Sequence, residues 1–213
     1  MTRKLLCVVT LVFGLTIAAA ADTVIFSDFG PGNSYDTSTG WTLGGPNSPV
    51  CCQEIAMQFT PGTTINLKQI DLAAGWVLGT NSLTLQLAVD NNGAPGTILE
   101  TWTLGPMGVF GQNNPPLTAI SVLNPLLQAG TVYDIVAIPA DDEWAAWNLN
   151  DQGVNGQFLF STDVGQTWNT TFGTLGAFDV IGGTTGGVPE PASLFLLGSG
   201  VAMIASKLKR TKK

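Results

Sequence analysis

Apolar and polar residues alternate along most of the chain between residues 22 and 181. In residues 82–90 the aliphatic side chains Leu83, Leu85, Leu87 and Val89 occupy every second position. Because successive side chains of a strand point to opposite faces, this period of two predicts strands with one buried face. Similar short segments recur at residues 23–27, 41–43, 53–59, 64–72, 97–104, 117–122, 131–138, 144–149, 156–161, 167–171 and 177–181.

The segments between these expected strands are rich in Gly, Pro, Asn and Asp, which favour turns. No long stretch of the body has the 3.6-residue period of a helix. The pattern therefore predicts an all-β fold, an antiparallel β-sandwich of jelly-roll type over residues 22–181. Within residues 64–72 the alternation changes phase between Leu67 and Ile70, which predicts a β-bulge there.

Residues 1–21 follow a different pattern. Arg3 and Lys4 precede an apolar run over residues 5–17, and alanines fill residues 18–21. A basic start, an apolar segment of this length and small residues at its end predict a helical signal peptide, cut after Ala21 or one residue earlier. The alternative is a retained N-terminal anchor, for which the apolar run is short.

The C-terminal residues place an apolar segment between a proline-rich motif and a basic tail. The motif reads Val188, Pro189, Glu190 and Pro191. Residues 192–206 are expected to form a short transmembrane helix, and the basic residues of 207–213 are expected to stay in the cytoplasm. Residues 182–187, which are rich in Gly and Thr, are expected to be a flexible linker. An ordinary tail anchor is the alternative interpretation.

The order of motif, short apolar span and basic tail resembles the PEP-CTERM sorting signal of Gram-negative bacteria. The resemblance covers residues 188–213. In that family exosortase, a membrane cysteine transpeptidase-like enzyme, reads the signal in organisms that make exopolysaccharide. The resemblance implies that exosortase and signal peptidase are partners of the chain. It also implies transient anchoring in the inner membrane, cutting near the motif, and release or attachment at the cell surface.

The body of the chain resembles the R type of the choice-of-anchor domains. The likeness lies in residues 29–36, 40–41, 85–96, 127–133 and 144–148. That family is a secreted β-sandwich found on different surface-anchoring tails. The resemblance implies extracellular display, and it brings no catalytic residues with it.

Charge is distributed very unevenly. Between residues 22 and 188 the chain has one basic residue, Lys68, against fourteen acidic residues, a net charge of −13. Such a domain repels phosphate backbones and anionic lipid, which argues against nucleic acid as a partner. The chain also contains no histidine, which excludes Ser-His-Asp and Cys-His catalysis and histidine metal sites.

Residues 161–168 match an Asp-box pattern, Ser-x-Asp-x-Gly-x-Thr-Trp, in which Ser161, Asp163, Gly165 and Trp168 are the key positions. The motif also occurs in sialidases and other secreted β proteins. Asp163 is expected to accept backbone N–H groups in the turn, Gly165 to take a positive φ, and Trp168 to pack beneath the hairpin. We interpret the motif as a structural staple of a hairpin.

Asp141, Asp142 and Glu143 form the densest acidic cluster. Their oxygens are the hard ligands that calcium prefers, although the spacing lacks the pattern of a calcium loop. A solvated acidic turn is the favoured interpretation. A hydrolase that uses these carboxylates is the least favoured, since a facing carboxylate partner is needed.

Six tryptophans are many for a domain with so little charge. Trp144, Trp147 and Asn148 form the preferred candidate patch for carbohydrate contact. On a regular strand Trp144 and Trp147 point to opposite faces, so only one of the two is expected to be exposed. Packing in the core is the competing interpretation for each tryptophan.

Cys51 and Cys52 are the only cysteines outside the signal peptide. In an oxidising compartment adjacent cysteines form either a vicinal disulfide or cross-links between chains. We expect the vicinal disulfide, which would stiffen the preceding loop.

These features together predict a secreted, non-enzymatic protein of a Gram-negative bacterium, without a cofactor unless calcium binds. Its expected role is structural or adhesive, in association with extracellular polysaccharide at the cell surface. The alternative is a carbohydrate-binding module that uses exposed Trp and Asn or Asp residues. A secreted hydrolase is a third and weaker hypothesis.

Overall fold

The structure is a computed structural model that describes residues 22–183. The predicted signal peptide, sorting motif, transmembrane helix and basic tail lie outside the described residues. The strands of the described part are β1 (Thr23–Ser27), β2 (Gly40–Gly44), β3 (Glu54–Phe59), β4 (Ile65–Leu72), β5 (Ala74–Leu78), β6 (Leu83–Asp90), β7 (Pro95–Leu104), β8 (Leu117–Ile120), β9 (Leu126–Leu127), β10 (Tyr133–Pro139), β11 (Trp144–Asn148), β12 (Asn155–Ser161), β13 (Asn169–Thr174) and β14 (Phe178–Gly183).

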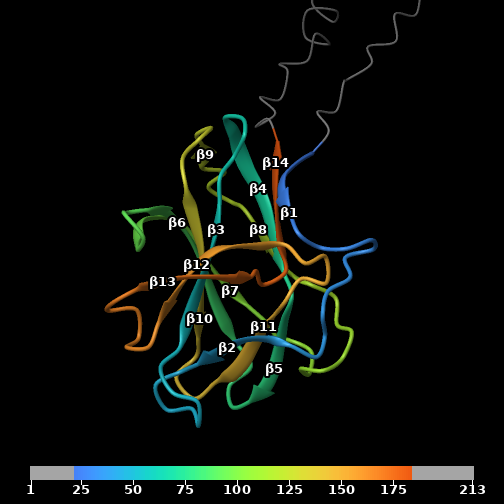
Figure 1. Ribbon diagram of the computed structural model, residues 1–213, viewed down its shortest axis with the longest axis vertical. Coiled ribbons are helices and arrows are strands. Elements are labelled where there is room, and N and C mark those ends of the chain that lie inside the picture. The colour runs from blue at the N-terminus through green and yellow to red at the C-terminus, as the bar shows by residue number, and fades with distance from the viewer. Residues whose placement is uncertain (1–21, 184–213) are drawn as a thin grey trace, which may run out of the picture.

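These strands form three antiparallel sheets (Figure 1). One sheet has five strands in the order β1-β14-β4-β8, with β9 also paired to β4. The second has six strands in the order β13-β12-β3-β10-β6-β7, and the third has three in the order β2-β11-β5. Residues of all three sheets share one hydrophobic core. The all-β class and the antiparallel β-sandwich are therefore confirmed for the described residues.

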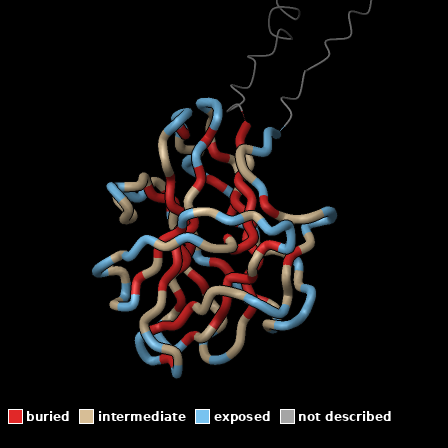
Figure 2. Tube along the Cα trace, viewed as in Figure 1, coloured by how far each residue is buried: buried red, intermediate tan, exposed pale blue. Residues whose placement is uncertain are grey.

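Inward-facing residues of the alternating strands fill the core. Met57 of β3, Ile135 of β10 and Leu87 of β6 lie opposite one another in register and are fully buried. Ile70 and Val180, which pair across β4 and β14, belong to the same cluster. Figure 2 shows buried residues running through the centre and exposed residues at the loops. Burial of apolar surface, worth about 25 cal/mol per Å², is the main force that holds the sheets together.

Trp147 of β11 joins the three-stranded sheet to the rest of the core. Its ring packs edge-on against Phe178 of β14, with ring centroids 6.1 Å apart. Its indole N–H donates to the carbonyl of Ala177 at 3.0 Å. Phe178 also stacks on Phe26 of β1, with centroids 4.4 Å apart. The start of β14 thus connects β1 and β11 through aromatic contacts.

The predicted bulge in residues 64–72 is present. Where β4 pairs with β14, Ile181 lies opposite Gln69 and Gly182 lies opposite Leu67, so Lys68 is the extra residue. The bulge keeps Leu67 and Ile70 on the buried side, because one additional residue restores the alternation.

The sequence pattern did not predict β5 and β9. Strand β5 contains Gly75, where an added Cβ would lie 2.8 Å from the Cα of Phe110. The glycine is therefore needed for close backbone packing, and it removes an apolar side chain from the alternation. The linker prediction is also corrected, since Gly182 and Gly183 belong to β14.

Both ends of the described region lie side by side. Thr23 of β1 pairs with Gly182 of β14. This end of the sandwich is far from the three-stranded sheet (Figure 1). Any segment that continues from β14 therefore leaves the domain beside its N-terminal strand.

Several carboxylates are buried without a basic partner. Among residues 22–183 the one salt bridge joins Lys68 to Asp22. Asp28 accepts the backbone N–H of Phe178 at 2.7 Å, but its second oxygen is buried without a partner. Burial raises the pKa of Asp28 to about 7. Burial, and then the facing Asp71 carboxylate, raise the pKa of Asp179 to about 6.

Asp134 shows the same effect on the outer face of the six-stranded sheet. The Gln58 side-chain amide donates to Asp134 and to Asp90, at 3.0 Å in each case. This hydrogen bond opposes the effect of burial, which nonetheless raises the pKa of Asp134 to about 6, with the Asp90 charge adding to it. The fold thus holds at least three carboxyl groups whose pKa is raised to about 6 or 7.

We expect the domain to be most stable near pH 4 and to lose stability as the pH rises to 8. A raised folded-state pKa means that the folded state binds more protons than the unfolded state, so the free energy of unfolding falls through this window. One pKa unit is about 1.4 kcal/mol, and about 1 kcal/mol shifts the Tm of such a domain by about 2–4 °C. Thermal melts should show a fall in Tm of at least about 5 °C between pH 4.5 and 8.

The matched variants are Asp28→Asn and Asp151→Asn. Asp28→Asn keeps the oxygen that accepts the Phe178 N–H and should flatten the fall in Tm above pH 5. Asp151 is exposed, and hydrogen bonds from Gln152 and Ser34 lower its pKa, so its replacement should leave the fall unchanged. A Tm that is constant or rises between pH 4.5 and 8 in the parent chain would contradict the prediction.

Candidate functional site

The outer face of the six-stranded sheet forms the floor of a shallow groove. Leu159 of β12, Ala56 of β3, Val136 of β10 and Gln86 of β6 lie in one cross-strand row. The first three are buried although they face away from the core, because Ile138 and Trp168 pack against them. The floor is therefore apolar on one side and carries an amide on the other.

Two loops border this floor. The turn and first residues of β7 supply Pro95, Gly96 and Ile98. The loop between β12 and β13 supplies Val164 and Trp168. Both segments project on the same side of the molecule in Figure 1. The hollow that they and the floor enclose has a volume of about 270 Å³.

The Asp-box holds the β12–β13 loop in one conformation. The Ser161 hydroxyl donates to Asp163 Oδ1 at 2.8 Å and accepts the Gly165 N–H at 2.9 Å. Asp163 in turn accepts the Thr167 N–H at 2.8 Å and the Thr167 hydroxyl at 2.6 Å. These bonds lower the pKa of Asp163, and they fix the chain one residue before Trp168. Of the four Asp-box positions, Ser161 and Asp163 shape the loop, and Gly165 and Trp168 line the groove, where Trp168 supplies the side chain.

Glu54 lies beneath this loop at the start of β3. It pairs with Ser161 of β12, and its side chain is only 5% exposed. Burial and the nearby Asp163 charge both raise the pKa of the Glu54 carboxyl, and no hydrogen bond lowers it. A Cβ at Gly165 would come within 2.8 Å of Glu54 Oε2, and Gly165 also has a φ of +71°. Glycine is thus required there both by conformation and by the carboxylate beneath it.

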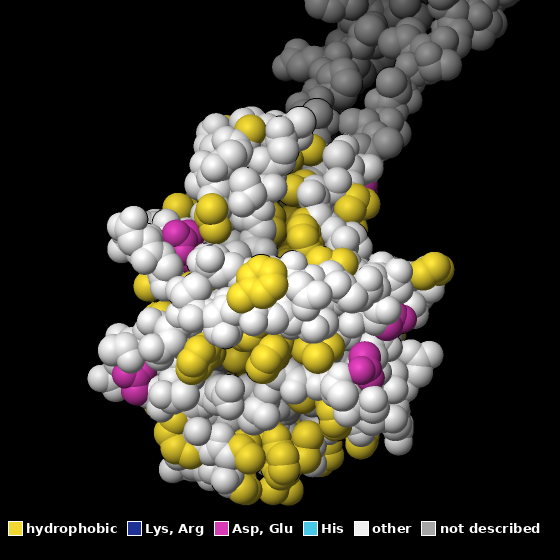
Figure 3. Space-filling model, in the orientation of Figure 1, with side chains coloured by type: hydrophobic (Ala, Val, Ile, Leu, Met, Phe, Trp, Pro, Cys, Tyr) yellow, Lys and Arg dark blue, Asp and Glu magenta, His cyan; other side chains and the backbone are white. Residues whose placement is uncertain are grey.

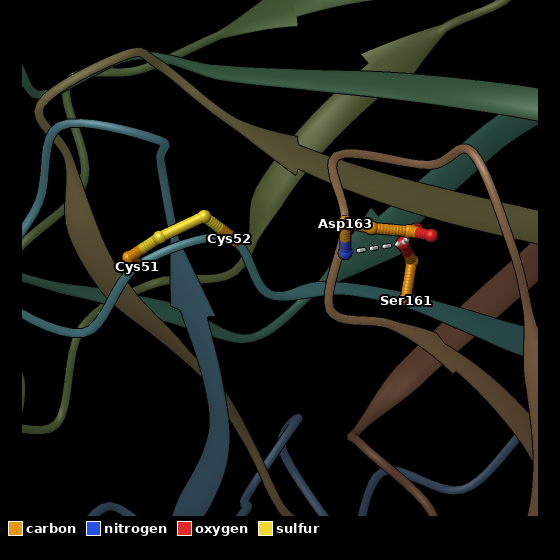
Figure 4. The surroundings of a disulfide bond; sticks show 4 residues. All are labelled: Cys51, Cys52, Ser161 and Asp163. Atoms are coloured by element: carbon orange, nitrogen blue, oxygen red, sulfur yellow. Dashed lines mark hydrogen bonds between the residues drawn. A yellow bond between two sulfur atoms is a disulfide. The ribbon is translucent and has the colours of Figure 1, made fainter.

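A second, smaller hollow of about 110 Å³ adjoins the first. Glu54 and Val164 line both hollows, and Cys52 lines the smaller one. Cys51 and Cys52 form a vicinal disulfide, which Figure 4 shows near Ser161 and Asp163. A disulfide between neighbours keeps the two side chains together and stiffens the loop that leads into β3.

Val164 has an unusual backbone conformation at the ridge between the two hollows. Its φ is 60°, although a β-branched side chain strongly disfavours this region. The side chain is about half exposed, so packing in the core does not explain the strain. Strained residues that the surrounding structure maintains are often found at binding sites.

The structure corrects the predicted carbohydrate patch. Trp147 is 0% exposed and belongs to the core, and Asn148 is 2% exposed. The Asn148 side-chain amide donates to the carbonyl of Asp36 at 3.0 Å, so it holds a loop. Trp144 is half-buried at the start of β11. The prediction of a patch formed by Trp144, Trp147 and Asn148 together is therefore wrong, and only Trp144 reaches the surface.

Two residues of the acidic cluster, Asp142 and Glu143, accept hydrogen bonds from the backbone of neighbouring loops. Glu143 is fully buried, and its carboxylate accepts the N–H groups of Ser82 and Ala140 at 3.0 Å each. Asp142 accepts the Thr80 N–H at 3.1 Å. Within residues 22–183 no group of three or more Cys, Asp or Glu is arranged to hold a metal ion.

Comparison with known proteins gives no match. This holds for family models, for curated proteins and for solved structures. In the described part of the chain, no helix has the length and apolar character needed to span a membrane.

Sequence reasoning identified Trp168 and the Asp-box but missed Glu54 and Gln86 as site residues. The signal was present in the alternation, because Ile55, Met57 and Phe59 face the core and so direct Glu54 to the other face. Its burial could not be predicted, since it depends on a loop that lies about a hundred residues further along the chain.

We expect Ser161→Ala to destabilise the domain by about 1–3 kcal/mol, because it leaves partly buried N–H groups without their acceptor. Ser161 is fully buried and accepts from both Asp163 and Gly165. Urea denaturation of the parent and variant measures the difference. Thr162→Ala, at an exposed neighbouring position, is the matched control and should change stability by less than about 0.5 kcal/mol. Equal stability of the two variants would contradict the role given to Ser161.

Proposed function

We propose that this chain is a secreted surface protein that exosortase sorts and that serves a structural or adhesive role in the extracellular polysaccharide layer. The observation that carries the proposal is the order of Val188, Pro189, Glu190 and Pro191, a short apolar span and a basic tail. The N-terminal residues support it, since they have the three parts of an export signal. In this proposal the protein is non-enzymatic, and its sandwich is of the jelly-roll type.

The charge, the surface and the disulfide of the described domain are compatible with an extracellular location. One lysine against fourteen acids before residue 188 keeps such a domain soluble and repels nucleic acid and anionic lipid. The surface in Figure 3 has scattered Asp and Glu side chains and bands of apolar side chains between uncharged polar groups. The vicinal disulfide is suited to an oxidising compartment.

The position of the ends also fits a domain that hangs from a C-terminal anchor. Because Thr23 pairs with Gly182, cleavage of a signal peptide and attachment through the C-terminal segment involve the same end of the sandwich. The groove on the six-stranded sheet lies on the side of the domain and stays accessible in that arrangement.

We expect the parent chain to lose its basic tail and to reach the cell surface or the medium. An epitope inserted between Thr185 and Gly186 keeps β14 intact and reports on the product. The chain is expressed in a Gram-negative host that has exosortase, and cells, inner membrane, envelope and medium are separated and probed. A Pro189→Ala, Glu190→Ala, Pro191→Ala triple variant should remain full length in the inner membrane.

The control is the parent chain in the same host without exosortase, which should behave like the triple variant. If parent and triple variant both remain full length in the inner membrane of the exosortase host, the C-terminal segment is only an anchor and the proposal fails. If both are processed alike, another enzyme cuts the chain and the role of exosortase is refuted.

A further inference from the structure

Trp168 differs from most other tryptophans of the domain in the hydrogen bonding of its indole N–H group. Among residues 22–183, the N–H groups of four tryptophans donate to backbone carbonyl oxygens at 2.8 to 3.0 Å: Trp41, Trp76, Trp102 and Trp147. Trp144 and Trp168 have no such acceptor in this part of the chain. Since a tryptophan N–H normally finds a partner when its ring is covered, these two remain available to a ligand.

Only one of these two tryptophans lines a hollow with further polar groups. Trp168 borders the larger hollow together with Glu54 and Gln86. Trp144 contributes to neither hollow. Trp168 presents an apolar ring, Gln86 presents an amide, and Glu54 presents a carboxylate that accepts no hydrogen bond within the described residues. Glu54 is 5% exposed, and its oxygens are not among the fully buried atoms without a partner, so a hydroxyl that enters the hollow can donate to them.

The three groups have the chemistry that a sugar ring requires. A pyranose has an apolar face formed by its C–H groups and an equatorial rim of hydroxyl groups. The apolar face packs on an aromatic ring, and the hydroxyls donate to a carboxylate and exchange hydrogen bonds with an amide. The hollow of about 270 Å³ lies at the small end of ligand sites, which measure about 300–1,000 Å³. It therefore suits one ring of an extended chain.

The charges around the groove decide which glycans fit. Glu54 lines the groove, and the nearby Asp163 charge acts on it. Asp90 and Asp134 lie on the same face of the sheet. Lys68, the one basic residue between residues 22 and 188, is paired with Asp22 on the other sheet. Within the described residues, a uronic acid, sulfate or phosphate group in the groove has no cation to pair with, and it faces like charges. The negative electrostatic potential of the groove therefore favours an uncharged polysaccharide.

We propose that the groove on the outer face of the six-stranded sheet binds an uncharged polysaccharide, with Trp168 as the stacking platform and Glu54 and Gln86 as hydrogen-bond partners. The site lies on a different sheet from the patch of Trp144 and Trp147 that the sequence favoured. This inference rests on the adhesive part of the proposed function and is independent of the sorting part.

The test is retardation in native gels that contain a soluble polysaccharide. The full chain is purified from an exporting host, in detergent where the anchor is retained. The gels contain an uncharged β-glucan, a mannan or a galactan, and alginate serves as the anionic comparison. We expect saturable retardation by at least one uncharged polymer. The retardation should persist at 0.5 M salt, because no ion pair contributes to binding.

Three substitutions test the site. Trp168→Ala should weaken binding at least about tenfold, and Glu54→Gln should weaken it about fivefold or more. Trp144→Ala is the matched control and should change binding less than about twofold. Because Trp168→Ala also removes packing on Leu159, Gln86→Ala is added as a variant at a half-buried position that leaves this packing intact, and a melt of each variant checks its fold.

The outcomes are decisive in both directions. Loss of retardation in Trp168→Ala and its reduction in folded Glu54→Gln or Gln86→Ala, with Trp144→Ala unchanged, support the proposal. It is overturned if no uncharged polymer retards the parent chain, if only alginate does, or if Trp144→Ala abolishes binding while Trp168→Ala does not. Trp168→Ala should still be sorted like the parent chain, so a failure of the groove and a failure of the sorting route remain distinguishable.

Discussion

The register of β12, β3, β10 and β6 is the constraint on which both the core and the groove depend. The same alternation that turns Met57, Ile135 and Leu87 inward turns Ala56, Val136 and Gln86 outward. A slip of one residue in one of these strands would exchange the two faces of that strand, and in β6 it would put Gln86 into the core. The apolar core therefore fixes the floor of the groove as well, and the outer row is positioned by interactions made on the opposite face.

The scarcity of basic residues is the second constraint. With Lys68 as the only cation between residues 22 and 188, buried carboxylates of the described residues are satisfied by uncharged donors, such as backbone N–H groups, or not satisfied at all. Glu143 belongs to the first class, since Ser82 and Ala140 donate to it and close two loops. Asp28 belongs partly to the second, since one of its oxygens is buried without a partner. Within residues 22–183 Glu54 also has no hydrogen-bond donor, but unlike Asp28 it borders a hollow that a ligand can enter.

Local patterns in the sequence predict local structure in this chain. The alternation identified most strands and even the phase change at Lys68, because both are properties of a single strand. The Asp-box could be predicted from the sequence because all its hydrogen bonds join residues within 161–167. In contrast, the burial of Trp147 depends on Ala177 and Phe178. The burial of Glu54 depends on Gly165. Neither could be predicted from local patterns, because the contacting residues are far apart in the sequence. Strand geometry predicted that only one of Trp144 and Trp147 would reach the surface, but which of them does so depends on neighbours distant in sequence, and Trp147 is buried while Trp144 is half-buried.

Both the borders and the floor of the groove are held in place before a ligand binds, which lowers the entropic cost of binding. The hydrogen bonds of the Asp-box hold the loop that presents Trp168, and the vicinal disulfide stiffens the segment that enters β3 at Glu54. Groups that are already in place lose little conformational entropy when a ligand arrives. The left-handed conformation of Val164 persists on the ridge because the bonds of Ser161 and Asp163 on either side determine it. A shallow site with few contacts gains most from such preorganisation, and repetition of weak sites along a polymer or a cell surface then raises the overall avidity.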